Sequence, residues 1–260
     1  MSNSHGHSIE ELEHVGLAAA NRAGDLLKAG FYSDLDVKIK SHKHDLVTQY
    51  DQKSEELIVS VIKDFFPHHA FVGEELGING SIKQNIYWVI DPIDGTWNFA
   101  RQIPSFAVSI AACYEDQTLL GICLDPISGE LFIGRRGKGA TMNGKSLKVS
   151  TASQLEDCGI SFGMSVGVNA IHEIALIRRS GSSVLDLCYV AKGALEGFIN
   201  HNQSVWDFAA AKLIVEEAGG VVTTFEGNPV PLDIARTHTI IASNGIIHKE
   251  LTQWISTAKH

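Results

Sequence analysis

Residues 91–96 read Asp-Pro-Ile-Asp-Gly-Thr and directly follow an apolar Tyr-Trp-Val-Ile run. Such a run is typical of a buried β-strand, and the proline fixes its own backbone while favouring an extended residue before it. Asp91 and Asp94 stand at a spacing that a turn folds into converging carboxylates. The carbonyl of Ile93 offers a neutral oxygen between them, and Gly95 lets the backbone approach a ligand with no Cβ in the way. The sequence therefore predicts a ligand site where this strand ends.

The same stretch combines two kinds of ligand chemistry. Carboxylates, a carbonyl and water are oxygen ligands that Mg²⁺ prefers. We expect the backbone amides of Gly95 and Thr96 to begin a short helix, where free N–H groups bind phosphate. A plain Asp-Pro turn with a capping aspartate is the structural alternative, and it is common in proteins. The whole six-residue string after an apolar strand favours a cation beside a phosphate cradle.

Two other acidic positions stand where a strand or loop meets a predicted helix. Glu74 lies in a Gly-Glu-Glu string, and Asp207 follows Trp206 at the start of a helix predicted over residues 207–218. Each is ordinary by itself, because paired loop glutamates are usually solvated and an aspartate at a helix start is usually a cap. Their presence together with the 91–96 string predicts one cation site built from distant parts of the chain.

The order of predicted elements changes near residue 150, where we place a domain boundary. Residues 1–150 form an α+β half with two helices, capped by Ser8 and Thr48, before a meandering antiparallel sheet. Residues 151–260 form an α/β half in which helices and strands alternate. The predicted helices cover residues 9–30, 49–66, 168–179, 183–192, 207–218 and 245–256, and the predicted strands cover 87–90, 106–114, 119–124, 131–133, 198–199, 221–224 and 239–242.

Composition and charge narrow the class of protein. Hydrophobic residues make up 44% and charged residues 20% of the 260 residues, which is typical of a globular chain. The net charge of −9 argues against nucleic acid or an anionic membrane as the main ligand. The four cysteines form no CxxC pair, so we expect reduced thiols and a cytoplasmic location. No apolar run approaches the roughly 20 residues that cross a bilayer.

Four segments together resemble the inositol monophosphatase family of Mg²⁺-dependent phosphomonoesterases. They stand in the family's order at family-like intervals, and the similarity extends from about residue 8 to residue 255. The segments are Asp-Leu-Val-Thr at 45–48 with Asp51, Gly-Glu-Glu at 73–75, the 91–96 string with Asn98 and Phe99, and Trp206-Asp207 with Glu-Ala-Gly-Gly at 217–220. The resemblance implies a layered α-β-α-β-α sandwich of the inositol monophosphatase or sugar phosphatase type. It also implies a homodimer, inhibition by Li⁺, and hydrolysis of inositol monophosphate or a similar small phosphomonoester.

The resemblance assigns a role to each matching residue. The ligands of two or three Mg²⁺ ions would be Glu74, Asp91, the Ile93 carbonyl, Asp94 and Asp207. The implied catalytic residues are Asp51, Thr96 and Glu74. Asp51 and Thr96 would orient and deprotonate the attacking water, while the ions lower its pKa and stabilise the leaving oxygen. The implied substrate contacts are Lys40, Asp94, Gly95, Thr96, Gly181, Ser182, Ser183 and Asn200.

Two positions depart from the family's pattern. Asn200 stands where many inositol-hydrolysing members carry a glutamate that accepts hydrogen bonds from ring hydroxyls. Because asparagine is neutral and both donates and accepts, it weakens the preference for inositol. Fructose 1,6-bisphosphate, 3′-phosphoadenosine 5′-phosphate, histidinol phosphate and NADP are therefore alternative substrates. Trp97 stands where a smaller residue is frequent; covering the phosphate cradle and packing into the core are the two alternatives, and we favour the core. His201, beside Asn200, is a candidate for the mouth of the pocket.

A regulatory protein that binds a transcription complex is the alternative of another class, because some bacterial relatives assist such complexes. A lost metal ligand or a distinct basic surface would favour that role as the sole one. All four acidic ligand residues are present and the net charge is −9, so we favour the enzyme. The expected partner is a small phosphomonoester, with neither nucleic acid nor a membrane as the main ligand.

Overall fold

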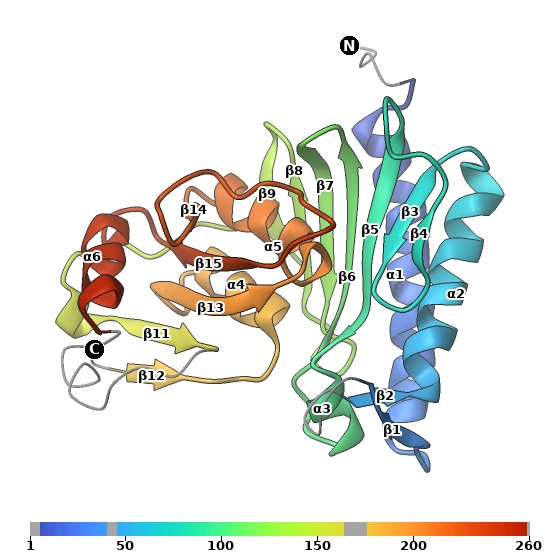
Figure 1. Ribbon diagram of the computed structural model, residues 1–260, viewed down its shortest axis with the longest axis horizontal. Helices are drawn as coiled ribbons and strands as arrows, with labels where there is room; N and C mark the ends of the chain where they lie inside the picture. Colours follow the sequence, from blue (N-terminus) through green and yellow to red (C-terminus); the bar gives the residue numbers. More distant parts are fainter. Residues whose placement is uncertain (1–5, 41–45, 164–175, 259–260) are drawn as a thin grey trace.

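Two large β-sheets and three layers of helices alternate in the computed structural model, which describes residues 6–40, 46–163 and 176–258 (Figure 1). A third, two-stranded sheet lies beside them. The helices are α1 (Ile9–Phe31), α2 (Gln49–Phe65), α3 (Thr96–Ala100), α4 (Ser183–Ala191), α5 (Val205–Glu217) and α6 (His248–Ala258), with a 3₁₀ turn η1 (Leu155–Asp157). The strands are β1 (Val37–Ile39), β2 (Leu46–Thr48), β3 (Ala70–Gly73), β4 (Gly77–Asn79), β5 (Ile86–Asp94), β6 (Ala107–Tyr114), β7 (Gln117–Leu124), β8 (Leu131–Arg135), β9 (Gly139–Met142), β10 (Lys145–Ser146), β11 (Gly159–Phe162), β12 (Leu176–Arg178), β13 (Gly197–Gln203), β14 (Val221–Thr224) and β15 (His238–Ser243).

The first sheet has eight strands in the order β10-β9-β8-β7-β6-β5-β3-β4. Neighbouring strands of this sheet run antiparallel, except β3 and β5, which run parallel to each other. Helices α1 and α2 cover one face, where they pack on Trp88 and Ile122 (Figure 1). Helix α1 approaches the sheet closely, because a Cβ at Gly16 would lie 2.8 Å from Cδ1 of Ile122. Strand β5 is buried on both faces, which explains its continuous apolar run.

The second sheet has five strands in the order β12-β11-β13-β15-β14. Strand β11 is parallel to β12 and β13, and the remaining pairs are antiparallel. Helices α4 and α5 lie between the two sheets, and α6 covers the outer face of the second one (Figure 1). A Cβ at Gly121 of β7 would lie 2.4 Å from the carbonyl oxygen of Ala210, so α5 is in close contact with the first sheet. The layers therefore follow the expected order α-β-α-β-α.

Local sequence signals predict several helix boundaries well. Ser8 caps α1 and Thr48 caps α2, each in a capping box with the acidic residue three positions later. Helix α5 begins two residues earlier than expected, with Ser204 as its N-cap, so Asp207 lies in its first turn. Helix α6 begins at residue 248 rather than 245, because the side chain of Asn244 instead accepts the amides of the next loop.

Two expectations about strands and helices were wrong. The predicted strand 87–90 is longer, because β5 continues through the acidic segment to Asp94 with an irregular register against β6. The helix predicted over residues 168–179 lies mostly outside the described residues. Its described end, residues 176–178, is instead strand β12, which pairs with β11 along the edge of the second sheet. Pairing with a neighbouring strand outweighs local helix preference there.

The link between the two sheets runs from β10 through η1 to β11. Helix α5 contacts the first sheet as well as the second, so the two predicted halves share a core. The domain boundary at residue 150 stays a prediction. Of the helices in the described parts of the chain, none is long and apolar enough to cross a bilayer.

Candidate active site

Three aspartates from two distant segments converge between the sheets. Asp91 and Asp94 end strand β5, and Asp207 lies in the first turn of α5. One carboxylate oxygen from each lies within 4.8 Å of the other two. Burial raises the pKa of Asp91 and Asp207 well above the ordinary value and that of Asp94 to about 7, and the neighbouring carboxylates add to the shifts. A cluster of this kind ionises fully only with a counter-charge, and its hard oxygens fit a divalent cation such as Mg²⁺.

The backbone after Asp91 turns back on itself. Oδ1 of Asp91 accepts the amide of Ile93 at 3.0 Å. The hydroxyl of Thr96 lies 3.0 Å from the carbonyl oxygen of Ile93 and 3.0 Å from Oδ1 of Asp51, so its single hydrogen is shared between two acceptors. Gly95 adopts φ +98°, a left-handed conformation that favours glycine, and it precedes α3. The expected turn into a short helix is therefore present.

Only one oxygen of Asp94 remains for a cation. Its Oδ2 accepts hydrogen bonds from the hydroxyl of Ser182 and, at 2.9 Å, from the amide of Val184. Both donors belong to the start of α4. The substrate segment predicted around residue 182 is thus attached directly to the aspartate cluster.

Glu74 stands beside the cluster and binds a lysine. It follows β3, and its amide donates to the carbonyl of Ile90 at 3.3 Å, next to Asp91. Nζ of Lys40 donates to Oε1 of Glu74 at 2.8 Å and also to Glu75. Burial raises the pKa of Glu74, and the charge of Lys40 opposes this shift. Lys40 therefore supplies positive charge where a cation would bind.

Asp51 connects helix α2 to Thr96. Its Oδ2 accepts the amide and the hydroxyl of Thr48, both at 2.7 Å, and its Oδ1 accepts from Thr96. The side chain is fully buried, and burial raises its pKa. Asp51 and Thr96 therefore form one hydrogen-bonded pair beside the cluster, and their catalytic role stays a prediction.

Two further residues of α2 contact the site, and sequence reasoning missed both. Ser54 donates to the carbonyl oxygen of Pro92 at 3.3 Å. Glu55 is 1% exposed, burial raises its pKa to about 7, and it accepts two backbone amides of the loop that follows Glu74. The signal was their spacing from Asp51, because residues i+3 and i+4 share its face of the helix.

The predicted substrate segment packs against the turn at Gly95. Gly181 has φ +89°, and a Cβ there would lie 2.8 Å from Nδ2 of Asn98. The same Nδ2 donates to the carbonyl of Ser180 at 2.8 Å and to that of Ser105 at 2.7 Å. A Cβ at Gly95 would lie 3.2 Å from the carbonyl of Gly181. Glycines at both positions therefore allow the two segments to approach closely.

Asn200 lies in β13, and both ends of its amide form a hydrogen bond. Its Nδ2 donates to the hydroxyl of Ser183 at 3.0 Å, and its Oδ1 accepts the amide of His201 at 2.9 Å. A Cβ at Gly163 would lie 2.0 Å from Oδ1 of Asn200, so the side chain fills space that this glycine leaves. Nδ1 of His201 lies 2.8 Å from the hydroxyl of Thr239.

The expectation that Trp97 packs into the core was wrong. Its side chain is at the surface, with 37% of the residue exposed, and the guanidinium of Arg101 lies 4.9 Å from the ring centroid. The i, i+4 spacing on α3 explains the contact, because it places a cation over the indole face.

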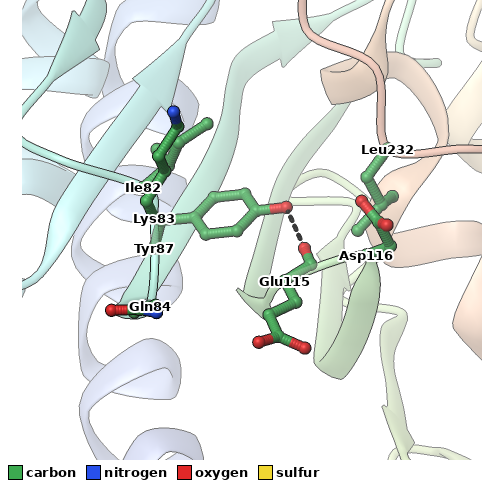
Figure 2. Close-up of a pocket in the computed structure, with 7 residues that line it drawn as sticks. All are labelled: Ile82, Lys83, Gln84, Tyr87, Glu115, Asp116 and Leu232. Carbon is green, nitrogen blue, oxygen red and sulfur yellow. Dashed lines mark hydrogen bonds between the residues drawn. The ribbon is translucent and has the colours of Figure 1, made fainter.

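A separate cavity of about 510 Å³ lies at the other end of β5. Figure 2 shows Tyr87 extending across it, with its hydroxyl donating to the carbonyl of Glu115 at 2.8 Å. Lys83, Asp116 and Leu232 also line this cavity. None of the predicted site residues is among the residues that line it.

The layered fold and the aspartate cluster are those of a phosphatase-type α/β sandwich. Comparison with known proteins identifies the family. The chain belongs to the inositol monophosphatase family, which it matches over residues 8–260. It is 37% identical to the Nus factor SuhB of Escherichia coli K12 over 252 residues, which cover 92% of this chain and 93% of that protein.

Two solved structures extend the comparison. An IMPase of Thermotoga maritima superposes with a TM-score of 0.88 at 31% identity, covering 96% of this chain and 98% of that one. An IMPase/NADP phosphatase solved with Mg²⁺ and phosphate has a TM-score of 0.82 at 27% identity, covering 95% and 94%.

Proposed function

We propose that the protein is a Mg²⁺-dependent phosphomonoesterase that hydrolyses inositol monophosphate or a similar small polyol or sugar phosphate. The observation that carries the proposal is the convergence of Asp91, Asp94 and Asp207, with an oxygen from each within 4.8 Å of the others. The related IMPase/NADP phosphatase that binds Mg²⁺ and phosphate supports it. Bound Mg²⁺ would lower the pKa of the attacking water and stabilise charge on the phosphoryl and leaving oxygens.

The side chains of this protein would hold two ions from two directions. Glu74, Asp91 and the carbonyl of Ile93 would hold the first, and Asp91, Asp94 and Asp207 the second. Oδ1 of Asp94 is the oxygen available for this role, since Oδ2 accepts hydrogen bonds from the start of α4. A third, weaker ion shared by Glu74 is part of the same proposal.

The Asp51–Thr96 pair would move the proton of the attacking water. The hydroxyl of Thr96 donates to Oδ1 of Asp51 at 3.0 Å, so its oxygen would accept a hydrogen bond from the attacking water. As the water's proton moves to that oxygen, the threonine's own proton would pass to the carboxylate of Asp51. Backbone amides around Gly95 would hold the phosphate, and Lys40, which binds Glu74, would add positive charge beside it. Gly181, Ser182 and Ser183 would contact the alcohol portion of the substrate.

Asn200 bears on which phosphomonoester is hydrolysed. The neutral amide is already bonded to Ser183, so it offers less hydrogen-bond acceptance to ring hydroxyls than a glutamate. The alternative substrates are fructose 1,6-bisphosphate, 3′-phosphoadenosine 5′-phosphate, histidinol phosphate and NADP. Phosphate release from a panel of these compounds and inositol monophosphate, with and without Mg²⁺, tests the proposal. No release from any of them would contradict the enzyme.

Three further expectations belong to the proposal. We infer a homodimer and inhibition by Li⁺ from the family resemblance. We infer a cytoplasmic location because all four cysteines, which lie within the described residues, are buried with free thiols. Sedimentation of the purified protein, a lithium titration of turnover and fractionation of cells test these three points.

A second candidate function is binding to a transcription complex. The observation that favours it is the 37% identity to a protein named as a Nus factor. The role is compatible with the enzyme, because the acidic cluster is intact. Affinity purification from a bacterial lysate, with the Asp94→Asn variant as a matched bait, tests it. Recovery of RNA polymerase or its elongation factors with both baits would support a role independent of catalysis, and their absence would contradict it.

A further inference from the structure

Helix α2 contacts the site through one face, and the proposed function gives no role to the side chain of Glu55 on that face. Asp51, Ser54 and Glu55 are spaced so that all three share this face. Asp51 binds Thr96, and Ser54 donates to the carbonyl of Pro92. Glu55 instead reaches the hairpin that carries Glu74, where it accepts the backbone amides of Glu75 and Leu76.

Glu55 closes the loop of the β3–β4 hairpin. Gly73 and Gly77 pair across this hairpin, so residues 74–76 form its loop. Oε2 of Glu55 accepts the amide of Glu75 at 2.8 Å, and Oε1 accepts the amide of Leu76 at 3.0 Å. Hydrogen bonds from amides to a carboxylate are stronger than those between neutral groups. One buried side chain therefore fixes two consecutive peptide groups directly after Glu74.

Gly73 leaves the space that Glu55 fills. A Cβ at position 73 would lie 1.7 Å from Oε1 of Glu55, which no pair of non-bonded atoms tolerates. On the other side, the amide of Glu74 donates to the carbonyl of Ile90 at 3.3 Å. Glu74 is thus held between a backbone bond to β5 and the two bonds that Glu55 makes to the loop.

We propose that Glu55 is a positioning residue for Glu74, because its carboxylate holds loop 74–76 in the arrangement that presents Glu74 beside the aspartate cluster. The inference rests on the proposed function, in which Glu74 binds a divalent cation. Each oxygen of Glu55 accepts one loop amide, so the side chain acts on the loop and, through it, on Glu74.

Titration with Mn²⁺, followed by the electron paramagnetic resonance of the free ion, tests this role. Glu55→Gln keeps the size but has one acceptor oxygen, so its NH₂ group faces one of the two loop amides. We expect Mn²⁺ affinity to fall about 10-fold in Glu55→Gln and about 100-fold in Glu55→Ala, the range found for groups that orient metal ligands. Turnover at saturating Mg²⁺ should return to within about two-fold of the unsubstituted protein in Glu55→Gln, which a partly unfolded variant would not show.

Glu56→Gln is the matched control. It makes the same chemical change one residue along α2, at an exposed side chain that accepts a hydrogen bond from Gln52 on its own helix and lies outside the hairpin loop. We expect unchanged Mn²⁺ affinity. Unsubstituted affinity in Glu55→Gln, or an equal loss in Glu56→Gln, would overturn the inference. Absence of Mn²⁺ binding by the unsubstituted protein would instead overturn the proposed function, and this inference with it.

A double-substitution cycle gives a second test. Where Glu55 is present, Gly73→Ala should weaken Mn²⁺ binding, since the new Cβ displaces the Glu55 side chain. In the Glu55→Ala background the space is open, so Gly73→Ala should add less than about two-fold. If Gly73→Ala lowers Mn²⁺ affinity equally with and without Glu55, the contact between positions 73 and 55 is not the cause of the loss, and the inference is overturned.

Discussion

The amide of Val184 donates a 2.9 Å hydrogen bond to Oδ2 of Asp94, which lies 90 residues earlier in the chain. The hydroxyl of Ser182 donates to the same oxygen. Asp94 therefore ends a strand of the first sheet and also binds the start of α4, where free amides and the helix dipole favour a negative charge. Because only Oδ1 remains for a cation, metal binding and the attachment of α4 depend on one side chain.

Asp94→Asn separates these two contributions. The amide oxygen of asparagine still accepts the Val184 amide, so we expect the fold to remain intact by circular dichroism. The lost charge removes a cation ligand, so turnover should fall by at least about 100-fold. Asp116→Asn is the matched control, because Asp116 is exposed in the β6–β7 hairpin, and it should leave turnover unchanged. Turnover close to that of the unsubstituted protein in Asp94→Asn would mean that the cluster is structural.

Ser182→Ala should affect stability and metal binding together. The Ser182 hydroxyl caps α4 by accepting the amide of Leu185 at 3.1 Å, and it also donates to Asp94. Loss of such a cap costs about 1 kcal/mol, which for a chain of this size lowers Tm by about 2–4 °C. Mg²⁺ affinity should fall as well, because Asp94 loses a partner that orients it. A lower Tm with unchanged Mg²⁺ affinity would limit Ser182 to helix capping.

Thr96→Val tests the Asp51–Thr96 pair. Valine keeps the shape of threonine but removes the hydroxyl that lies 3.0 Å from Oδ1 of Asp51. We expect kcat to fall by about 100-fold, within the range attributed to general acid–base groups. Thr96→Ser restores a hydroxyl and should recover most of the rate. A rate in Thr96→Val equal to that of Thr96→Ser would show that the hydroxyl takes no part in the reaction.

Local sequence signals predicted the features that depend on neighbouring residues. The capping boxes at Ser8 and Thr48 and the apolar run of β5 are of this kind, since their hydrogen bonds and periodicity lie within a few residues. The short strands of the antiparallel β1–β2 pair and of the β3–β4 hairpin were not predicted. Three or four residues carry too little periodicity, and their pairing depends on distant neighbours.

The sequence indicated which residues form the candidate site, but only some of the contacts between them. The acidic strings indicated which oxygens gather, because two aspartates, a carbonyl and a glycine turn stand together directly after an apolar run. The bonds of Asp94 to the start of α4, and of Glu55 to the loop after Glu74, join residues far apart in the chain. Such contacts follow from how the sheets and helices pack, which no local pattern specifies.

Asn200→Glu should change the order of preferred substrates. A glutamate there would accept from the Ser183 hydroxyl and from ring hydroxyls of a polyol. We expect kcat/KM for inositol monophosphate to rise about 10-fold relative to the other phosphomonoesters, which corresponds to about one additional hydrogen bond. Asn200→Gln controls for size without charge and should shift the order much less. An unchanged substrate profile in Asn200→Glu would remove this position from the specificity of the enzyme.

Proton linkage predicts how stability without metal depends on pH. Burial raises the pKa of Asp94 from 3.8 to about 7 in the folded protein. The folded state therefore binds more protons than the unfolded chain between these values. The stabilisation is complete below pH of about 4 and is lost as pH rises through about 7, so the free energy of unfolding falls across this window. The raised pKa values of Asp91 and Asp207 act in the same direction.

Mg²⁺ should reverse this loss, because it binds the ionised carboxylates. Thermal unfolding with a chelator or with Mg²⁺ at 100 times its Kd measures the effect at pH 5 and pH 8. At pH 8 we expect a gain of about 2.7 kcal/mol, or about 5–10 °C in Tm for a chain of this size. At pH 5 protons compete for the same oxygens, so the gain should be much smaller. Asp94→Asn should reduce the difference between the two pH values, since it removes one of the titrating ligands. An equal Mg²⁺ shift at both pH values would mean that the ion binds away from the buried aspartates.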